Sequence, residues 1–196
     1  NGRRDIGHEF GTNPCSEIGM QPYDACRLIA VNLFSFVVDP WTPGAYFDYE
    51  KFYEVNYEAM RLSDDLIDLE IKHIDRIIAK IESDPEDEEI KYVELKLWHK
   101  VRATAQASRR TGLGVTALGD ALAAMGMKYD SDRALSAIES IMQTKMSSEL
   151  DCTIDLAILR GTFEGWDPNL EIGDAKNTFY DFIAENFTEQ WSRMCK

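Results

Sequence analysis

The chain has 196 residues, of which 44% are hydrophobic and 29% charged, a composition typical of a folded globular protein. Its formal net charge of −14 argues against nucleic-acid binding, because neutralising phosphates requires clustered lysine and arginine. No apolar run reaches the length of a membrane span, and the four cysteines do not make a secreted disulfide scaffold, so we expect a cytoplasmic protein with reduced thiols and no membrane partner.

Residues 1–22 contain four glycines and two prolines without helical periodicity, which predicts an irregular segment. Within it, the sequence Thr-Asn-Pro-Cys-Ser-Glu-Ile places Asn13, Cys15 and Glu17 at alternate positions. If the backbone is extended there, alternate side chains leave on the same side. An amide, a thiol and a carboxylate aimed at one small volume form a candidate catalytic site. The alternative is a surface turn with a buried, inert cysteine.

Residues 25–38 form a nearly continuous β-branched and aromatic run between two prolines. Such a pattern predicts a strand that is buried on both faces, as in a parallel sheet. A single strand cannot satisfy its own backbone hydrogen-bonding groups, so we expect its partners elsewhere in the sequence.

Everything after Phe47 has helical periodicity, with apolar residues at intervals of three and four. The pattern predicts helices over about 48–82, 87–108, 116–125, 132–159 and 174–193, with Asp48 as the N-cap of the first. His73 falls on the apolar face of that helix, where we expect a packed core histidine. Three histidines and no Cys-x-x-Cys motif predict no metal site.

Between the second and third predicted helices, residues 109–114 read Arg-Arg-Thr-Gly-Leu-Gly. A Gly-x-Gly sequence before a helix is a weak phosphate-binding signal. It does not follow a predicted strand, so close backbone packing is the better interpretation. Cys152, within the fourth predicted helix, is expected to be a small buried residue.

Three stretches of the sequence resemble the catalytic (large) subunit of ribonucleotide reductases. They are the Thr-Asn-Pro-Cys-Ser-Glu-Ile segment followed by Ala-Cys-Arg-Leu at 25–28, the Met-Arg-Leu-Ser-Asp-Asp-Leu-Ile-Asp sequence at 60–68, and Arg-Arg-Thr-Gly-Leu-Gly-Val at 109–115 with its small-residue helix. They occur in the family's order, and the Asn-Pro-Cys form resembles the adenosylcobalamin-dependent branch, although some metal-dependent members share it. The resemblance implies a central piece of the family's ten-stranded α/β barrel.

The resemblance also implies the roles of four residues. Cys15 would form the transient thiyl radical that abstracts the 3′-hydrogen of the ribose. Glu17 would take the 3′-hydroxyl proton, Asn13 would bind the substrate hydroxyls, and Cys26 would be one of two thiols that end as a disulfide. The implied cofactor is adenosylcobalamin, or alternatively a metal-radical small subunit. The implied partners are the rest of the barrel, a ribonucleotide, a thioredoxin-type reductant and a second copy of the enzyme.

We therefore expect a single partial domain that is mainly α with one or two buried strands. It would comprise a radical-bearing loop at 1–22, a barrel strand at 23–39 and a helical region at 47–196, and it would be inactive without the rest of the barrel. Two other functions stay open at this point. One is a helical assembly piece without chemistry of its own, and the other is a thiol oxidoreductase using Cys15 and Cys26, whose spacing is unlike Cys-x-x-Cys.

Overall fold

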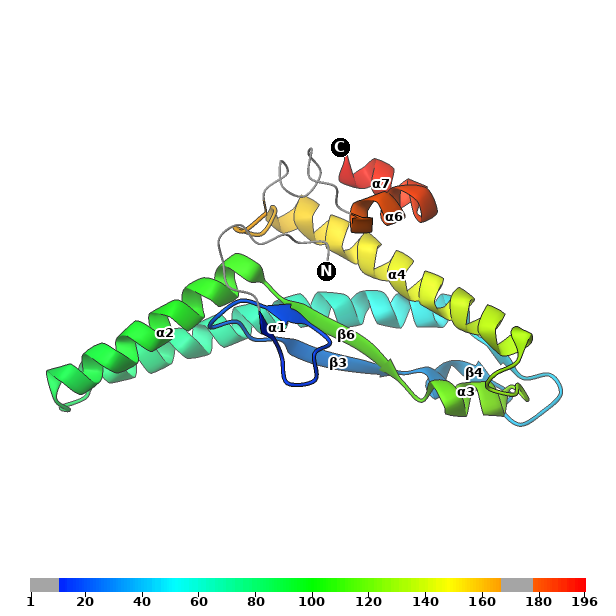
Figure 1. Cartoon of the computed structure of the whole chain (residues 1–196), viewed down its shortest axis with the longest axis horizontal. Coiled ribbons are helices and arrows are strands. Elements are labelled where there is room, and N and C mark those ends of the chain that lie inside the picture. The colour runs from blue at the N-terminus through cyan, green and yellow to red at the C-terminus, as the bar shows by residue number, and fades with distance from the viewer. Residues whose placement is uncertain (1–10, 167–177) are drawn as a thin grey trace. The chain divides into compact units, whose positions relative to one another are not determined.

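The computed structural model describes residues 11–166 and 178–196, and most of these are helical (Figure 1). Its six short strands form three two-stranded pairs, β1 with β2, β3 with β6 and β4 with β5, and no closed barrel forms among the described residues. The chain divides into two compact units. Unit 1 comprises residues 1–27, 64–112 and 160–188, and unit 2 comprises residues 28–63, 113–159 and 189–196. Among the described residues, no helix is both long and apolar enough to cross a membrane.

Polar side chains begin the long helices where the sequence predicted them. In α1 (Tyr49–Ser83), the Asp48 carboxylate accepts a hydrogen bond from the Lys51 backbone N–H at 3.0 Å, which confirms the predicted N-cap. At the start of α2 (Glu88–Ser108), the Asp87 carboxylate accepts a hydrogen bond from the Glu89 backbone N–H at 2.9 Å. These caps satisfy backbone donors that the first helical turn leaves unpaired.

The core of unit 2 is built from strand, turn and helix residues. Strand β3 (Arg27–Asn32) pairs with β6 (Thr111–Thr116), and β4 (Val37–Val38) pairs antiparallel with β5 (Tyr46–Phe47). Short helix α3 (Leu118–Ala124) and the long helix α4 (Asp132–Arg160) contribute further buried residues. The largest fully buried side chains of this core are those of Leu33, Phe52, Leu122 and Ile141.

Phe52 lies at the centre of an aromatic group in this core. Its ring is fully buried and meets those of Phe36 and Phe47 edge-on, with centroid distances of 5.1 and 5.4 Å. We expect Phe52→Ala to lower the free energy of unfolding by about 3–5 kcal/mol, because it removes buried contacts and leaves a cavity. Chemical denaturation of the protein measures this loss. The exposed Tyr46→Ala is the control, and equal stability of the two variants would contradict the packing described here.

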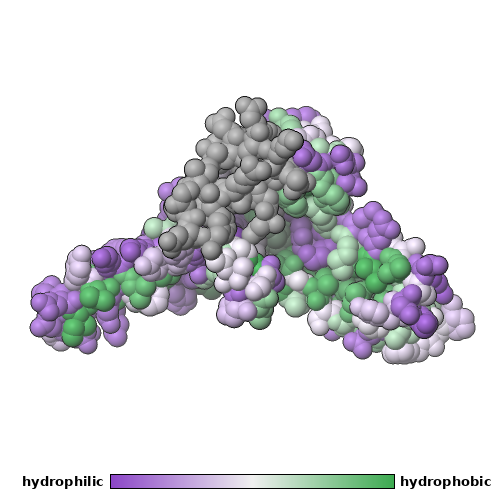
Figure 2. Space-filling model, in the orientation of Figure 1, coloured by the Kyte–Doolittle hydropathy of each residue, from purple (hydrophilic) through white to green (hydrophobic). Residues whose placement is uncertain are grey.

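Unit 1 contains the C-terminal half of α1 and helix α2, which run side by side (Figure 1). Ile67, Ile74 and Ile78 are buried along α1, and Arg102 of α2 donates to Asp75 of α1 at 2.6 Å. Figure 2 shows hydrophobic residues along this pair of helices, flanked by hydrophilic ones. Three hydrophobic residues of α2 are about half exposed or more: Ile90, Val93 and Leu97.

The predicted strand over residues 25–38 is shorter than expected. Strand β3 ends at Asn32, whose side chain accepts a hydrogen bond from the Phe34 backbone N–H and begins a 3-10 turn at Leu33–Phe36. The turn directs Leu33 and Phe36 into the core. The prediction that the strand is buried on both faces is also wrong for β3, because alternate residues are exposed and Leu28 is 67% exposed. The covered face of β3 carries Arg27, Ile29 and Val31, and β6 pairs with one edge of the strand.

A second strand was missed by sequence analysis. Residues 111–116, interpreted as an interruption between helices, form β6. Gly112 and Gly114 weakened the signal because glycine is depleted in strands, although Leu113 and Val115 alternate with other residues as strand residues do. A Cβ added at Gly114 would lie 3.9 Å from the carbonyl oxygen of Ile29 in β3, which is ordinary contact. Pairing with β3, rather than local propensity, accounts for the strand.

The buried face of α1 differs from the face that the sequence predicted. His73, expected in the core, is exposed, and so are Leu62 and Leu69. The buried row instead includes Asn56, Ser63 and Ile67. The helix carries apolar residues on more than one face, so periodicity alone does not identify the face that packs.

The final predicted helix is divided in two. Helix α6 (Thr178–Asn186) ends where the Asn186 side chain donates to the Phe182 carbonyl at 2.9 Å, and α7 (Thr188–Met194) follows. The predicted start of this helix, at about residue 174, lies outside the described residues. Cys152 is fully buried, as predicted.

Candidate active site

A small hairpin carries the three predicted loop residues. Strands β1 (Gly11–Thr12) and β2 (Gly19–Met20) pair antiparallel, and the loop between them contains Cys15. The Asn13 side-chain oxygen accepts from the Ile18 backbone N–H at 3.0 Å, and the Asn13 backbone N–H donates to the Ile18 carbonyl at 3.2 Å. Asn13 thus closes the loop at its base. Its Nδ2 hydrogens are the donors that it can offer to a ligand.

The loop backbone is turned rather than extended. The Ser16 N–H donates to the Asn13 carbonyl at 2.9 Å, and Ser16 has a φ of 62°, in the left-handed region. The premise of alternating side chains in an extended chain is therefore wrong for residues 13–17. The alternative of a buried cysteine is also wrong, because Cys15 and Glu17 are both exposed. The hairpin presents a thiol and a carboxylate, two residues apart, on an accessible loop.

Cys26 lies just before β3 and is half-buried. Burial raises the pKa of its thiol, the guanidinium groups of Arg27 and Arg110 oppose this rise, and the carboxylates of Glu17 and Asp24 add to it. The influence of Glu17 on this pKa indicates that the loop carboxylate and the Cys26 thiol share one electrostatic neighbourhood.

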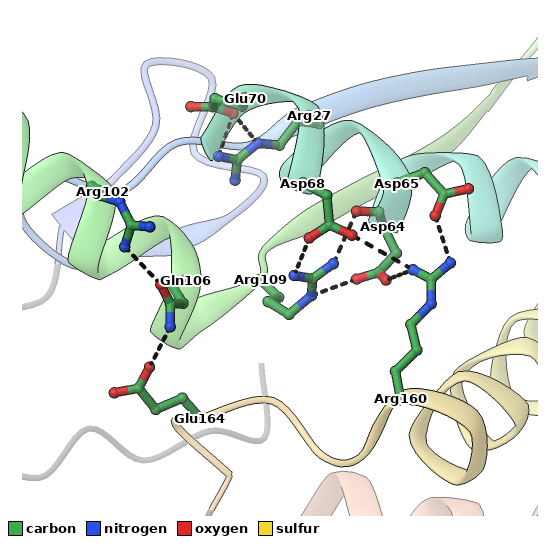
Figure 3. Close-up of polar contacts among 10 residues, drawn as sticks. All are labelled: Arg27, Asp64, Asp65, Asp68, Glu70, Arg102, Gln106, Arg109, Arg160 and Glu164. Atoms are coloured by element: carbon green, nitrogen blue, oxygen red, sulfur yellow. Dashed lines mark hydrogen bonds and ion pairs between the residues drawn. The ribbon is translucent and has the colours of Figure 1, made fainter. Parts of the chain in front are cut away.

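Arg27, the residue after Cys26, is fixed from three sides. Its guanidinium pairs with Glu70 of α1 (Figure 3) and donates to the backbone carbonyls of Ala25 at 2.8 Å and Arg110 at 3.3 Å. The Arg27 side chain is 8% exposed, so these bonds lie in a largely dehydrated environment. They hold the start of β3 against α1 and against the start of β6.

A second ion-pair network joins α1 to the ends of α2 and α4 in unit 1 (Figure 3). Arg109 ends α2 in a left-handed conformation with φ 40° and donates to Asp64 and Asp68 at 2.7 and 2.8 Å. Arg160 bonds Asp65 at 2.6 Å and also Asp64. The hydrogen bond from Arg109 lowers the pKa of Asp68. Three clustered carboxylates resemble a cation site, but two guanidinium groups already bond to them and offset most of their charge, so we interpret the cluster as structural.

Sequence analysis did not predict these arginine contacts. The Asp-Asp-x-x-Asp sequence at 64–68 and the Arg-Arg pair at 109–110 were noted as parts of a resemblance, without a physical role. Their opposite charges were the available signal, but the paired residues are 41 to 96 positions apart in the chain. Nothing local indicates which carboxylate each arginine contacts.

A thiol-bearing loop followed by strand β3, two helices and its paired strand β6 forms a segment of an α/β protein with an exposed cysteine on the loop. The family described as "Ribonucleotide reductase, barrel domain" matches residues 6–195. The chain belongs to this family.

Relatives of the chain carry names that agree with this family. The chain is 27% identical over 163 residues to a vitamin B12-dependent ribonucleoside-diphosphate reductase of Thermoplasma acidophilum, and 30% identical over 157 residues to one of Mycobacterium tuberculosis. It is 26% identical over 165 residues to a vitamin B12-dependent ribonucleotide reductase of Streptomyces clavuligerus. These matches cover 80–84% of the chain but 15–18% of the relatives, so the chain spans less than a fifth of their length.

Proposed function

We propose that this chain supplies the radical loop and two neighbouring barrel strands, β3 and β6, of a ribonucleotide reductase that makes deoxyribonucleotides. The observation that carries the proposal is Cys15, exposed on a hairpin loop with Asn13 and Glu17, in a chain whose residues 6–195 match the family. The open edges of the paired strands suit completion by further strands of the barrel. The chain is inactive without them.

In the proposed reaction, the Cys15 thiyl radical takes the 3′-hydrogen of the ribose and becomes a thiol. Glu17 accepts the proton of the 3′-hydroxyl, for which an exposed carboxylate two residues from the thiol is suitably placed. Asn13 donates from Nδ2 to a substrate hydroxyl, since its side-chain oxygen already accepts from Ile18. The 2′-hydroxyl leaves as water after taking up a proton. At the end of the reaction the Cys15 thiol returns the hydrogen atom to C3′, which restores the thiyl radical.

Replacing the 2′-hydroxyl by hydrogen requires two electrons and two protons, which two thiols supply as they form a disulfide. We assign Cys26 as one of the two. Its half-buried position before β3, in the electrostatic neighbourhood of Glu17, supports this role. An external dithiol of the thioredoxin type then reduces the disulfide by thiol–disulfide exchange.

The named relatives support adenosylcobalamin as the source of the radical and a ribonucleoside diphosphate as the substrate class. When bound, the cobalamin supplies the radical that oxidises the thiol. Of the described residues, the exposed Cys15 fits this requirement, because its sulfur is accessible to a group held by another part of the enzyme. A metal-radical subunit would use the same thiol. We also place the protein in the cytoplasm, where a reducing environment keeps its four free cysteines reduced.

The test of the assigned reductant is Cys26→Ser in the complete reductase. Because a serine hydroxyl cannot form a disulfide, we expect the variant to form the radical and attack the substrate but to lose multiple turnover with a dithiol reductant. Product formation and substrate breakdown are both measured by chromatography. Cys195→Ser is the control, since Cys195 is also free and lies outside the proposed site. Normal multiple turnover by Cys26→Ser would remove Cys26 from the reaction.

A further inference from the structure

Cys26 is bracketed by two ion pairs that meet at the starts of β3 and β6. On one side, the Asp24 carboxylate accepts from Arg110 Nε at 2.6 Å, from Ser108 Oγ at 3.1 Å and from the Ala25 backbone N–H at 2.9 Å. The Asp24 side chain is 0% exposed and that of Arg110 is 13% exposed. On the other side, Arg27 pairs with Glu70.

These contacts fix the backbone immediately before the thiol. The Asp24 carboxylate accepts from the Ala25 N–H, and Arg27 donates to the Ala25 carbonyl, so both backbone polar groups of Ala25, the residue before Cys26, are held by buried charged side chains. Arg27 also donates to the Arg110 carbonyl, which connects the two ion pairs. These hydrogen bonds restrict the backbone next to Cys26, so the position of the Cys26 thiol is well defined.

We propose that Asp24 and Arg110 are positioning residues for Cys26, and that Arg110 and Arg27 provide the positive charge that stabilises its thiolate. The proposal rests on the proposed role of Cys26 in thiol–disulfide exchange. In that exchange the external dithiol attacks the disulfide, one protein sulfur leaves as a thiolate and takes up a proton, and the two reductant sulfurs form the new disulfide. A nearby cation favours the leaving thiolate.

The charged groups around Cys26 predict opposite effects for two variants. The charged groups that influence the pKa of the thiol are Arg27, Arg110, Glu17 and Asp24. Arg110→Gln removes a positive charge, so the thiol pKa rises and its alkylation by iodoacetamide at pH 8 slows by about threefold. Asp24→Asn removes a negative charge, so alkylation accelerates by a similar factor. Arg110→Lys keeps the charge and restores most of the wild-type rate.

The experiment follows alkylation of Cys26 in the complete reductase from pH 6 to pH 10, by mass spectrometry of the peptide that contains it. The matched control is Arg102→Gln, because Arg102 Nε also bonds a carboxylate, Asp75, at 2.6 Å but lies outside the groups that influence the thiol. We expect its pH profile to match the wild type. Turnover with a dithiol should fall for Arg110→Gln and recover in Arg110→Lys.

Three results would overturn the inference. Equal profiles for Arg110→Gln and Arg102→Gln would show that Arg110 does not influence the thiol. Faster alkylation in both Arg110→Gln and Asp24→Asn would indicate general loosening of the structure. A lysine variant as slow as the glutamine variant would show that charge is not the cause. These outcomes are separate from the test of Cys26→Ser, whose normal turnover would remove Cys26 from the proposed reaction even if Arg110 controls the thiol.

Discussion

Cys15→Ala in the complete reductase is expected to lower turnover at least ~10⁴-fold, because no other side chain on the loop can form a thiyl radical. Cys15 is exposed on the β1–β2 loop, so the substitution removes little buried surface and should leave the free energy of unfolding nearly unchanged. The measurement is deoxyribonucleotide formation with saturating ribonucleotide, reductant and adenosylcobalamin. Thermal unfolding of the same preparation confirms that the protein is folded.

The control for this prediction is Cys195→Ala, which also removes an exposed free thiol. We expect it to retain wild-type turnover. Appreciable turnover by Cys15→Ala in a preparation with intact substrate binding would exclude Cys15 as the radical residue. It would also favour the open alternative of a chain without chemistry of its own.

Glu17→Gln is expected to reduce turnover by about 10²–10⁴-fold, the contribution typical of a general base. Glutamine keeps the shape of the side chain but cannot accept the 3′-hydroxyl proton. Because the carboxylate of Glu17 raises the pKa of the Cys26 thiol, its removal should also lower that pKa and shift the Cys26 alkylation profile to lower pH. The two effects are measured on one preparation, by turnover and by mass spectrometry.

Glu94→Gln serves as the matched control, since Glu94 is an exposed carboxylate on α2. It should change neither turnover nor the alkylation profile. An unchanged rate in Glu17→Gln would remove Glu17 from the chemistry. An unchanged alkylation profile would show that Glu17 and Cys26 do not share an electrostatic environment.

The features that sequence analysis predicted well depend on local interactions. Asp48 caps α1 because its carboxylate lies next to the first helical turn, and Gly126 ends α3 with a φ of 68° that favours glycine. Cys152 is buried within a helix, as predicted for a small residue of a type that is usually buried. In each case the residues that determine the structure are close together in the sequence.

The features that it missed depend on distant partners. Strand β6 forms because β3 lies beside it, although glycines lower its intrinsic strand preference. His73 is exposed because packing in the folded chain selected a different face of α1. The Asp24–Arg110 pair joins residues 86 positions apart, and no local pattern connects them. Residues 13–18 form a loop, as predicted, but the hairpin strands on either side of it were not predicted, and residues 1–10 lie outside the described residues. The turned backbone of the loop follows from the Asn13 side chain accepting from Ile18.

The central claim, that Cys15 is the residue that becomes a radical, is tested most directly by electron paramagnetic resonance. The complete reductase is prepared with cysteine deuterated at its β-carbon, mixed with adenosylcobalamin and substrate, and frozen rapidly. We predict a cysteine-derived signal that narrows on deuteration, is absent in Cys15→Ala and persists in Cys26→Ser. The same signal in Cys15→Ala, at wild-type intensity, would contradict the account.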